Sequence, residues 1–456
     1  MQKLNKELAT EIKRHDNGQV EKLIYIGSGT TCNVYQTESK DIIKEFAPRI
    51  RVNNEFVDLM SRNVSNGELI PLRSLSPFHL DILKEKRILF DSEISIVNEL
   101  NHRYRTEEDN MFIFSSDIPQ TSLGRCHWCN YVGGRTLEKV FIESKDNSLD
   151  FKQYFLNILP FIISLYDEIA FYHRDNEDNV SDNGILNLDI KPENLFAIKS
   201  QGDYIGIRNL DFGSLRRIDD KYDNGVLIES GLISLIRNYA AENKNVDINM
   251  LVSQISSKFF ASSPGFYDND RINKTILKCL NLETPIEDIV LDLKLLDILA
   301  AWKTFLFAFV ESKENLILED KFETETELIF RVFADIFENN PLSESSLFES
   351  YNIYSQLYEI MARSFKGKRK FRLTASKIAD RLRNILCVLK GVPENKKTEE
   401  QRDFETMNLI YSRKDELLKS HNLTTIKDIL NLCKMNNLSN EMGDIHWFLM
   451  FGEKHG

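Results

Sequence analysis

Cysteine is scarce in this sequence: six residues of this type are spread over 456 positions without a paired framework. Small secreted proteins gather cysteines into disulfide frameworks, so this spacing favours a reducing compartment, with the cytosol as the default. An excess of positive charge is also missing, because the formal net charge is -12 at pH 7. That balance argues against a broad nucleic-acid-binding face, and no nucleic-acid partner is expected.

A continuous apolar run of membrane-spanning length is absent as well. The longest candidates cover residues 155–166 and 295–310; the first is short, and Asp297 and Lys303 interrupt the second. A spanning helix needs about 20 apolar residues, so both runs are predicted to be buried helices, and no membrane span is expected. The polar first residues also lead us to expect no signal peptide. The hydrophobic fraction of 42% and the charged fraction of 28% are ordinary for a globular protein.

Alternating apolar and polar residues predict a small, mostly β lobe. Residues 20–46 alternate around a glycine turn, which predicts three short antiparallel strands. Further strands are predicted at 111–114 and 125–132, before a glycine pair that breaks the pattern. Residues 1–19 are treated as a polar segment outside this lobe.

A long connection interrupts the β lobe. Residues 47–89 exceed the length of a simple connection and are interpreted as an insertion. Within it, residues 55–60 and 80–86 have helix-like patterns. After it, residues 91–100 place apolar side chains on one face, which predicts an amphipathic helix.

From residue 137 onward the apolar period is helical, which predicts a larger α-helical lobe. Helices are predicted at 226–241, 248–260 and 375–389. One β-hairpin is expected inside this lobe, because the turn at 200–203 joins two apolar runs.

The polar, charged residues 393–402 indicate a domain boundary. Residues 393–456 are predicted to form a helical extension that packs on the large lobe or on a partner.

The most informative stretch reads Leu-Asp-Ile-Lys-Pro-Glu-Asn at 188–194, with Asp-Phe-Gly downstream at 211–213. Phosphoryl transfer needs a carboxylate that orients a hydroxyl group, a cation beside the moving phosphoryl group, and side chains that hold Mg²⁺. A carboxylate and an amide five residues apart are common by chance, but the Lys and Pro between them and the downstream Asp-Phe-Gly make this a strong signal. The pattern predicts a magnesium-ATP phosphoryl-transfer site built from Asp189, Lys191, Asn194 and Asp211.

At these motifs the chain resembles the eukaryotic-like (Hanks-type) serine/threonine protein kinases, as a divergent member. The resemblance implies an α+β, bilobal protein-kinase-like fold that binds ATP between its lobes. It implies that Asp189 orients the substrate hydroxyl and accepts its proton, while Lys191 stabilises the transferring phosphoryl group. Asn194 and Asp211 would hold Mg²⁺.

The resemblance also divides the chain. It assigns residues 20–132 to the N-lobe, with the insertion at 47–89, and residues 133–392 to the C-lobe. The C-lobe would contain an extended activation segment at 214–263. Substrate specificity or autoinhibition is expected to be located in this segment. Residues 393–456 would be the helical C-terminal extension.

Gly27, Gly29 and Val34 resemble the glycine-rich loop that covers ATP phosphates, where missing side chains let backbone N–H groups approach the anion. Cys32 stands at the third glycine of that pattern. A plain glycine hairpin is the alternative interpretation. Lys44 fits the lysine that contacts the α and β phosphates, and an isolated strand lysine is its alternative.

Glu93 resembles the helix glutamate that pairs with this lysine, and Glu85 is the fallback partner. Lys44 and Glu93 lie farther apart in sequence than is usual in the family, so the insertion at 47–89 is expected to loop out.

Asn130 and Val132 resemble the hinge whose backbone groups bond adenine, with Cys129 as the gatekeeper. Cys126 and Cys129 also form a C-x-x-C pair, which leaves a zinc or redox site as an alternative. Without a second pair, strand residues are the better interpretation.

The catalytic loop departs from the family pattern, since Asn187 and Leu188 stand where His-Arg is usual. The arginine normally binds a phosphate on the activation segment, so Leu188 removes a charged receptor and not a catalytic group. Activity is therefore not expected to need phosphorylation of that segment. Asn187 is expected to hydrogen-bond near the Asp-Phe-Gly backbone.

Residues 262–270 resemble a degraded form of the segment that ends in Ala-Pro-Glu, with Asp270 replacing the closing glutamate. Arg372 matches the arginine that normally pairs with it, so an Asp270–Arg372 ion pair is predicted. Asp297 matches the buried aspartate that holds the catalytic-loop backbone, and an exposed helix position is its alternative.

Taken together, the residues favour an ATP- and Mg²⁺-dependent serine/threonine protein kinase that acts on a protein hydroxyl group. A pseudokinase or nucleotide-binding scaffold is one alternative, and a small-molecule kinase is the other. A location in the cytosol is expected, or in a host cytosol if the chain is a delivered effector.

Overall fold

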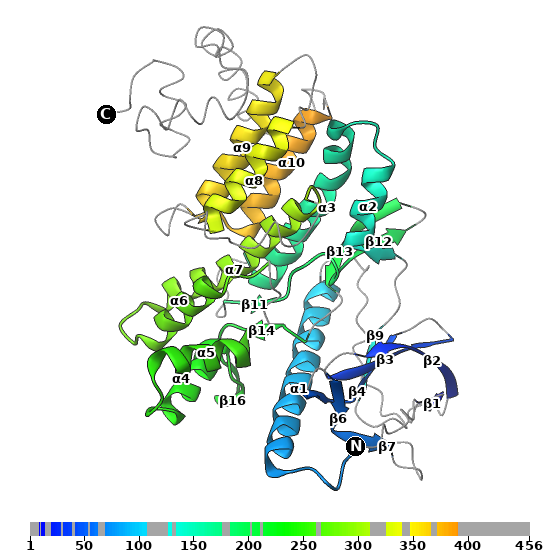
Figure 1. Ribbon diagram of the computed structural model, residues 1–456, viewed down its shortest axis with the longest axis vertical. Helices are drawn as coiled ribbons and strands as arrows, with labels where there is room; N and C mark the ends of the chain where they lie inside the picture. The colour runs from blue at the N-terminus through cyan, green and yellow to red at the C-terminus, as the bar shows by residue number, and fades with distance from the viewer. Residues whose placement is uncertain are drawn as a thin grey trace. The chain divides into compact units, whose positions relative to one another are not determined.

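The computed structural model divides the chain into two compact units, Met1–Gly133 and Gly134–Gly456. Their boundary falls beside the predicted lobe boundary at residue 133. The first unit carries a curled sheet and the second is mostly helical, so the fold is mixed α and β (Figure 1). The structure describes residues 9, 11–13, 20–28, 31–38, 42–52, 55–62, 69–106, 126–129, 134–175, 183–200, 203–209, 213–260, 266–310, 325–339, 347–365 and 372–390.

The first unit is built on an antiparallel sheet with the order β1-β2-β3-β4-β9. The strands predicted over 20–46 are present as β2, β3 and β4, and the strand predicted at 125–132 is present as the shorter β9. The bounds are β1 (Glu11–Lys13), β2 (Val20–Ser28), β3 (Cys32–Thr37), β4 (Ile42–Phe46) and β9 (Cys126–Cys129).

Strand β1 corrects the placement of residues 1–19 outside the lobe. It pairs with β2 at Val20–Lys22, and Ile12 is fully buried beside Leu23, Tyr35 and Ile43. Ile12 therefore anchors the strand in the core, while the preceding Glu11 is exposed, as alternation along a strand requires.

The residues interpreted as an insertion form two β-hairpins. Strand β5 (Arg49–Val52) pairs with β6 (Glu55–Asp58), and β7 (Met60–Arg62) pairs with β8 (Leu69–Pro71). The helix-like interpretation of 55–60 is therefore wrong. Phe56 and Val57 favour extended backbone, and the pairing with β5 satisfies their peptide groups.

Helix α1 (Pro77–Thr106) is one continuous helix of 30 residues. It joins the pieces predicted at 80–86 and 91–100, so the insertion ends well before residue 89. Ser76 explains the early start, because its hydroxyl accepts from the backbone N–H of His79 at 3.3 Å. Proline suits the first helical position, since it has no N–H to leave unpaired.

The second unit contains a sheet with the order β10-β12-β13. Its strands are β10 (Gly134–Thr136), β12 (Leu195–Ser200) and β13 (Asp203–Asn209), and β12 with β13 is the predicted hairpin. A two-stranded ladder joins β11 (Ile185–Leu186) to β14 (Arg216–Arg217). These two ladders flank the residues between Leu186 and Leu195.

The segment after Gly213 begins with a hairpin where a helix was predicted from residue 226. Strand β15 (Lys221–Asp223) pairs with β16 (Val226–Glu229). Asn224 and Gly225 connect them with φ values of 49° and 81°. Asn-Gly is the strongest short hairpin signal because both residues tolerate positive φ, and this signal outweighed the helical pattern.

The helices of the second unit pack into one core, with α8, α9 and α10 side by side in Figure 1 and α10 against α3. Their bounds are α2 (Leu137–Asp146), α3 (Phe151–His173), α4 (Leu232–Glu242), α5 (Ile248–Phe259), α6 (Asn269–Leu280), α7 (Ile286–Phe307), α8 (Glu325–Asn339), α9 (Leu347–Phe365) and α10 (Ala375–Leu389).

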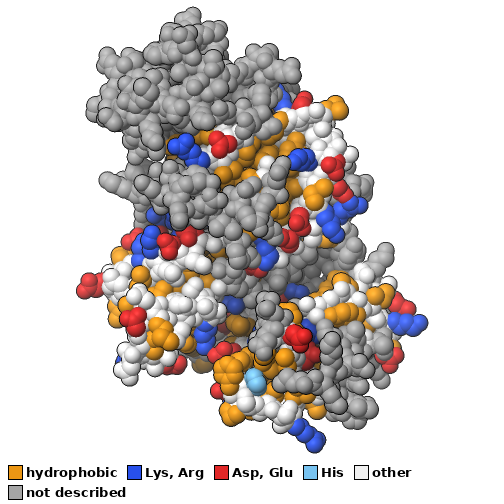
Figure 2. All heavy atoms as spheres, in the orientation of Figure 1, with side chains coloured by type: hydrophobic (Ala, Val, Ile, Leu, Met, Phe, Trp, Pro, Cys, Tyr) orange, Lys and Arg blue, Asp and Glu red, His pale blue; other side chains and the backbone are white. Residues whose placement is uncertain are grey.

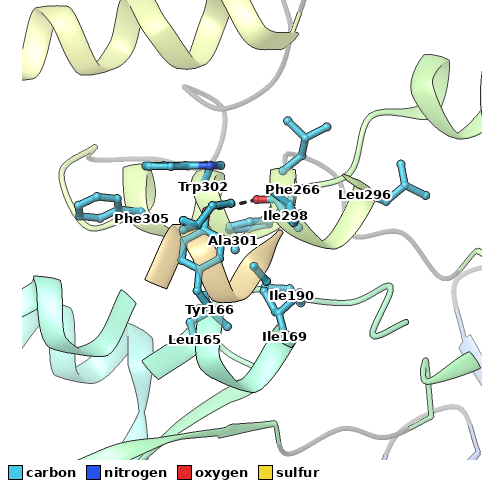
Figure 3. Close-up of a cluster of buried hydrophobic side chains, with 14 of the residues drawn as sticks. Leu165, Tyr166, Ile169, Ile190, Phe266, Leu296, Ile298, Ala301, Trp302 and Phe305 are labelled. Atoms are coloured by element: carbon cyan, nitrogen blue, oxygen red, sulfur yellow. Dashed lines mark hydrogen bonds between the residues drawn. The ribbon is translucent and has the colours of Figure 1, made fainter. Parts of the chain in front are cut away.

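The centre of this core lies between α3 and α7. Figure 3 shows Tyr166 of α3 beneath Trp302 of α7, with the Tyr166 hydroxyl donating to the backbone oxygen of Ile298 at 3.4 Å. Helix α3 is long and apolar enough to cross a membrane by length and composition, but 67% of its most apolar window is buried inside the protein. Packing against protein accounts for its apolar character.

Basic and acidic side chains are interspersed over the described part of the face in Figure 2. The strand predicted at 111–114 and the extension predicted at 393–456 lie outside the described residues.

Candidate functional site

The candidate catalytic loop runs from β11 to β12 and is anchored by one buried carboxylate. Asp297, in the middle of α7, accepts from the backbone N–H of Asn187 at 2.8 Å and of Leu188 at 2.9 Å. Asp297 is completely buried, so it is not an exposed helix position. The predicted contact between this aspartate and the loop backbone is present.

Two side chains complete the shell around Asp297. The Tyr267 hydroxyl donates to it at 3.1 Å, and Nε2 of His173 lies 3.1 Å from the same carboxylate. Its two oxygens therefore meet four donors, which is how a buried charge avoids the cost of desolvation. Sequence reasoning missed both contacts: Tyr267 lies in the segment 262–270 and His173 stands alone, and neither carries a local signal that names a distant partner.

Tyr267 also reaches the loop directly, since its oxygen accepts from the backbone N–H of Ile190 at 3.1 Å. Burial, together with the neighbouring Asp297 charge, raises the pKa of Tyr267 well above its ordinary value. The phenol thus stays protonated and can donate to Asp297. Three hydrogen bonds, to the backbone N–H groups of Asn187, Leu188 and Ile190, therefore hold the loop backbone.

The anchored backbone includes one strained residue. Leu188 has a φ of 59°, a left-handed conformation that L-residues adopt at a cost of roughly 1–2 kcal/mol. Its side chain is buried, with 1% exposure. A strained, over-determined backbone of this kind is a feature of functional sites.

Asp189 lies at the centre of a polar cluster on this loop. Nζ of Lys191 lies 3.0 Å from both carboxylate oxygens of Asp189. Nδ2 of Asn194 donates to the Asp189 carboxylate at 2.7 Å and to its backbone oxygen at 3.1 Å. The structure therefore brings together three of the four residues predicted for phosphoryl transfer; Asp211 lies outside the described residues.

The orientation of Asn194 bears on metal binding. Both groups that its amide nitrogen meets are acceptors, so the network fixes Nδ2 toward Asp189 and leaves the amide oxygen on the other side. A carbonyl oxygen beside a carboxylate is the kind of donor set that Mg²⁺ takes. These residues fit a magnesium ion, although the described residues contain no cluster of three His, Cys, Asp or Glu side chains.

The first unit supplies the lysine-glutamate pair. Nζ of Lys44 on β4 lies 3.1 Å from Oε1 of Glu93 on α1, and the side chains are 14% and 5% exposed. Glu93 is thus the partner of Lys44, and the fallback through Glu85 is not needed. The pair joins the sheet to the helix within this unit.

The glycine hairpin is present in part. Gly27 pairs with Val34 across β2 and β3, and an added Cβ at Gly27 would meet nothing within 4 Å. Cys32, at the third glycine position, is buried against Phe46 and Phe90 and so belongs to the core. Gly29 lies outside the described residues.

The predicted hinge residues, Asn130 and Val132, also lie outside the described residues. Cys126 and Cys129 are the two ends of strand β9, which pairs with β4. Strand residues are therefore what the structure shows for this C-x-x-C pair.

Asn187 bonds within the catalytic loop; Asp211 and Phe212 lie outside the described residues, so its bond near the Asp-Phe-Gly backbone stays a prediction. Its Oδ1 accepts from the backbone N–H of Asp189 at 3.3 Å, within the loop itself. The side chain is 2% exposed. Asn187 therefore supports the Asp189 backbone, because a short amide side chain reaches a peptide group two residues away.

The predicted Asp270–Arg372 ion pair is wrong. Arg372 instead pairs with Asp292 of α7 at 3.2 Å, and Lys278 of α6 pairs with the same carboxylate. Asp270 lies in the first turn of α6, where its N–H is capped by Asp268 at 3.0 Å. An acidic residue is favourable at a helix N-terminus, which explains Asp270 without a distant partner.

The segment after Gly213 is held by its own charges. Arg217 of β14 pairs with Glu229 of β16 at 2.9 Å, and their side chains are only 6% and 14% exposed. Asp220 accepts from the Gly231 N–H at 2.7 Å and from Ser234 at 2.9 Å. These carboxylates therefore tie together the start of the segment and the N-terminus of α4.

A polar stripe on α3 faces the strand that leads to Asp211. Ser164 and Glu168 contact β13: the Ser164 hydroxyl accepts from the Ile207 N–H at 2.9 Å, and Glu168 pairs with Arg208 at 3.0 Å. Tyr172 donates to Glu168 at 2.6 Å. Residues four apart share one helix face, so the stripe fixes the last residues of β13 against the core.

Sequence comparison with known proteins finds similarity over part of the chain. No protein-family model matches the chain. Over 126 residues the chain is 29% identical to myosin light chain kinase 2, skeletal/cardiac muscle, of Rattus norvegicus. This stretch is 27% of the chain and spans only 17% of that kinase. The chain is distantly similar to a protein kinase.

Among solved structures, the chain is similar to one described as "PpkA-294 apo form", with a TM-score of 0.40 and 15% sequence identity. The likeness covers 79% of this chain and 95% of that chain.

Proposed function

We propose that this chain is an ATP- and Mg²⁺-dependent serine/threonine protein kinase that transfers the γ-phosphoryl group of ATP to a protein hydroxyl group. One observation carries the proposal: Asp189, Lys191 and Asn194 converge on a loop whose backbone is held by the buried Asp297. Preorganised charge at a fixed loop is what phosphoryl transfer requires of a protein.

In the proposed mechanism Asp189 orients the substrate hydroxyl group and accepts its proton. Lys191 contacts Asp189 at 3.0 Å, and its charge would stabilise the transferring phosphoryl group. Asn194 and Asp211 would hold the metal, and Lys44, fixed by Glu93, would position the α and β phosphates. Bound Mg²⁺ would neutralise negative charge on the phosphates.

The proposed activity is independent of phosphorylation in the segment 214–263. Leu188 replaces the usual phosphate receptor and is buried, while Arg217 is neutralised by Glu229. We expect mass spectrometry of the active protein to find no obligatory phosphosite in this segment. Loss of activity after phosphatase treatment, recovered with a phosphosite there, would contradict this.

The decisive experiment compares the wild type with Asp189→Asn and Asp189→Ala in labelled ATP and Mg²⁺. We expect transfer onto protein by the wild type and a loss of about 10²–10⁴-fold in both variants, the range for a general base. Thermal unfolding of each variant controls for folding. Equal transfer by wild type and Asp189→Asn rejects the mechanism.

A nucleotide-binding pseudokinase is the second candidate, favoured by the burial of Cys32 at the third glycine position. It predicts ATP binding without transfer. Transfer onto a metabolite pool instead of protein would identify a small-molecule kinase. We also propose a cytosolic location, or a host cytosol for a delivered effector, which the scarcity of cysteine in the sequence supports.

A further inference from the structure

The inserted hairpins are packed into the first unit and do not loop out. Leu59, between β6 and β7, is 1% exposed and lies in a cluster with Cys32, Phe46, Leu83 and Phe90. The cluster therefore contains side chains from the insertion, the glycine hairpin and α1. Close packing of this kind transmits displacements, because cores are not compressible.

Backbone hydrogen bonds join the insertion to the same strands. The N–H of Ala47 donates to the oxygen of Thr31 at 2.9 Å, and the N–H of Leu59 donates to the oxygen of Pro48 at 3.0 Å. The chain that leaves β4 is thus fastened to the glycine hairpin before it enters β5.

A chain of buried polar side chains makes a second connection. Arg49 of β5 donates to Asp58 of β6 and to Oδ1 of Asn33 on β3. Nδ2 of Asn33 donates to Glu45 of β4 at 3.1 Å, and the Tyr35 hydroxyl donates to the same oxygen at 3.0 Å. Asn33, Glu45 and Arg49 are 5%, 0% and 4% exposed, so each depends on its partners.

This polar chain ends beside Lys44. Asn33 pairs with Glu45 in the sheet, and the next pair is Val34 with Lys44. Successive strand residues point to opposite faces, so fixing Glu45 on one face fixes Lys44 on the other, where Glu93 lies. Any shift of β5 and β6 that moves Asn33 and Glu45 also moves Lys44.

We propose that the hairpin β5–β6 is a built-in positioning element for the Lys44–Glu93 pair, and that Arg49 is a positioning residue for the nucleotide lysine. This rests on the proposed function, because it assigns Lys44 to the phosphates of ATP. On this proposal, the inserted hairpin determines the position of the Lys44 ammonium group relative to the ATP phosphates.

The test labels lysines with an acyl-phosphate derivative of ATP and counts the labelled Lys44 and Lys191 peptides by mass spectrometry. Lys191 is the internal reference, because it belongs to the second unit and has no part in the polar chain of Arg49, Asn33 and Glu45. We expect Arg49→Met to lower the Lys44 to Lys191 ratio about tenfold, as misplacement by a fraction of an ångström can. Arg49→Lys should recover part of it.

Two further variants make the test robust. Lys22→Met is the matched control, since the Lys22–Glu38 pair is 80% and 62% exposed in the same sheet, and it should leave the ratio unchanged. Asp58→Asn changes a side chain that is 34% exposed, so it tests the positioning role even if Arg49→Met does not fold. We expect this variant to lower the Lys44 to Lys191 ratio about threefold.

The coupling to Glu93 separates positioning from general support of the fold. In the Glu93→Gln background, Arg49→Met should cause no further fall in the ratio. A folded Arg49→Met or Asp58→Asn protein with the wild-type ratio overturns the positioning role and leaves the proposed function intact. Wild-type protein labelled at neither lysine contradicts the proposed function, and this inference with it.

Discussion

The catalytic loop and the lysine-glutamate pair are held in place in opposite ways. The loop depends chiefly on Asp297, which contacts two peptide groups and two side chains in the core of a helical unit, one of which, Tyr267, also binds the loop at Ile190. The pair depends on a chain of modest contacts spread over strands, hairpins and α1. Replacing Asp297 should therefore disorder the loop in a single step. Changes around the Lys44–Glu93 pair should each displace its side chains only slightly.

Replacing Asp297 is expected to have the largest effect, on both stability and activity. Asp297→Ala leaves the N–H groups of Asn187 and Leu188 and the ring of His173 without their buried acceptor, at roughly 1–3 kcal/mol each. We expect the free energy of unfolding in urea to fall by about 4 kcal/mol or more, with loss of activity. The control Asp335→Ala, at an exposed position on α8, should stay within about 0.5 kcal/mol. Similar losses in both variants would remove the contrast.

The pair predicts a large effect on activity and a small one on stability. Glu93→Gln keeps the shape of the side chain but removes the charge that holds Lys44, so kcat/KM for ATP should fall by about 10²-fold. Thermal unfolding should show little change, because the glutamine amide oxygen can still accept a hydrogen bond from the largely buried Lys44 ammonium, which is 14% exposed. Glu85→Gln should leave activity unchanged; a larger loss in that variant would make Glu85 the working partner.

The corrected ion pair predicts a moderate effect on stability. In a double-mutant cycle, Arg372→Met and Asp292→Asn should be coupled by about 1 kcal/mol, because the two side chains are partly buried and 3.2 Å apart. Arg372→Met and Asp270→Asn should be additive within about 0.5 kcal/mol. Urea unfolding measures both cycles, and coupling to Asp270 would restore the family's pairing.

The smallest effect concerns a thiol in the helical unit. Burial raises the pKa of Cys279 to about 12, so almost no thiolate exists near neutral pH. We expect iodoacetamide at about pH 8 to spare Cys279 in the folded protein and to modify it in urea. The less buried Cys387 should react faster in the native state. Rapid native modification of Cys279 would show that the core around α6 opens.

Local signals explain which features were predictable. The strands of residues 20–46, the β12–β13 hairpin and the loop residues Asp189 to Asn194 are contiguous in sequence, so their patterns suffice. The errors at 55–60 and 226–229 came from reading apolar content as helical where a cross-strand partner or an Asn-Gly turn decided the outcome. The rest of the helix predicted at 226–241 is present as α4.

By itself the sequence determined the candidate chemistry, because Asp189, Lys191 and Asn194 need only a short loop to come together. Tertiary structure decided which distant groups support them. His173 lies 124 positions before Asp297, and Arg372 lies 80 positions after Asp292. Partners at such separations depend on how the helices pack and on which buried charges require a hydrogen-bonding partner. A local sequence pattern indicates neither of these.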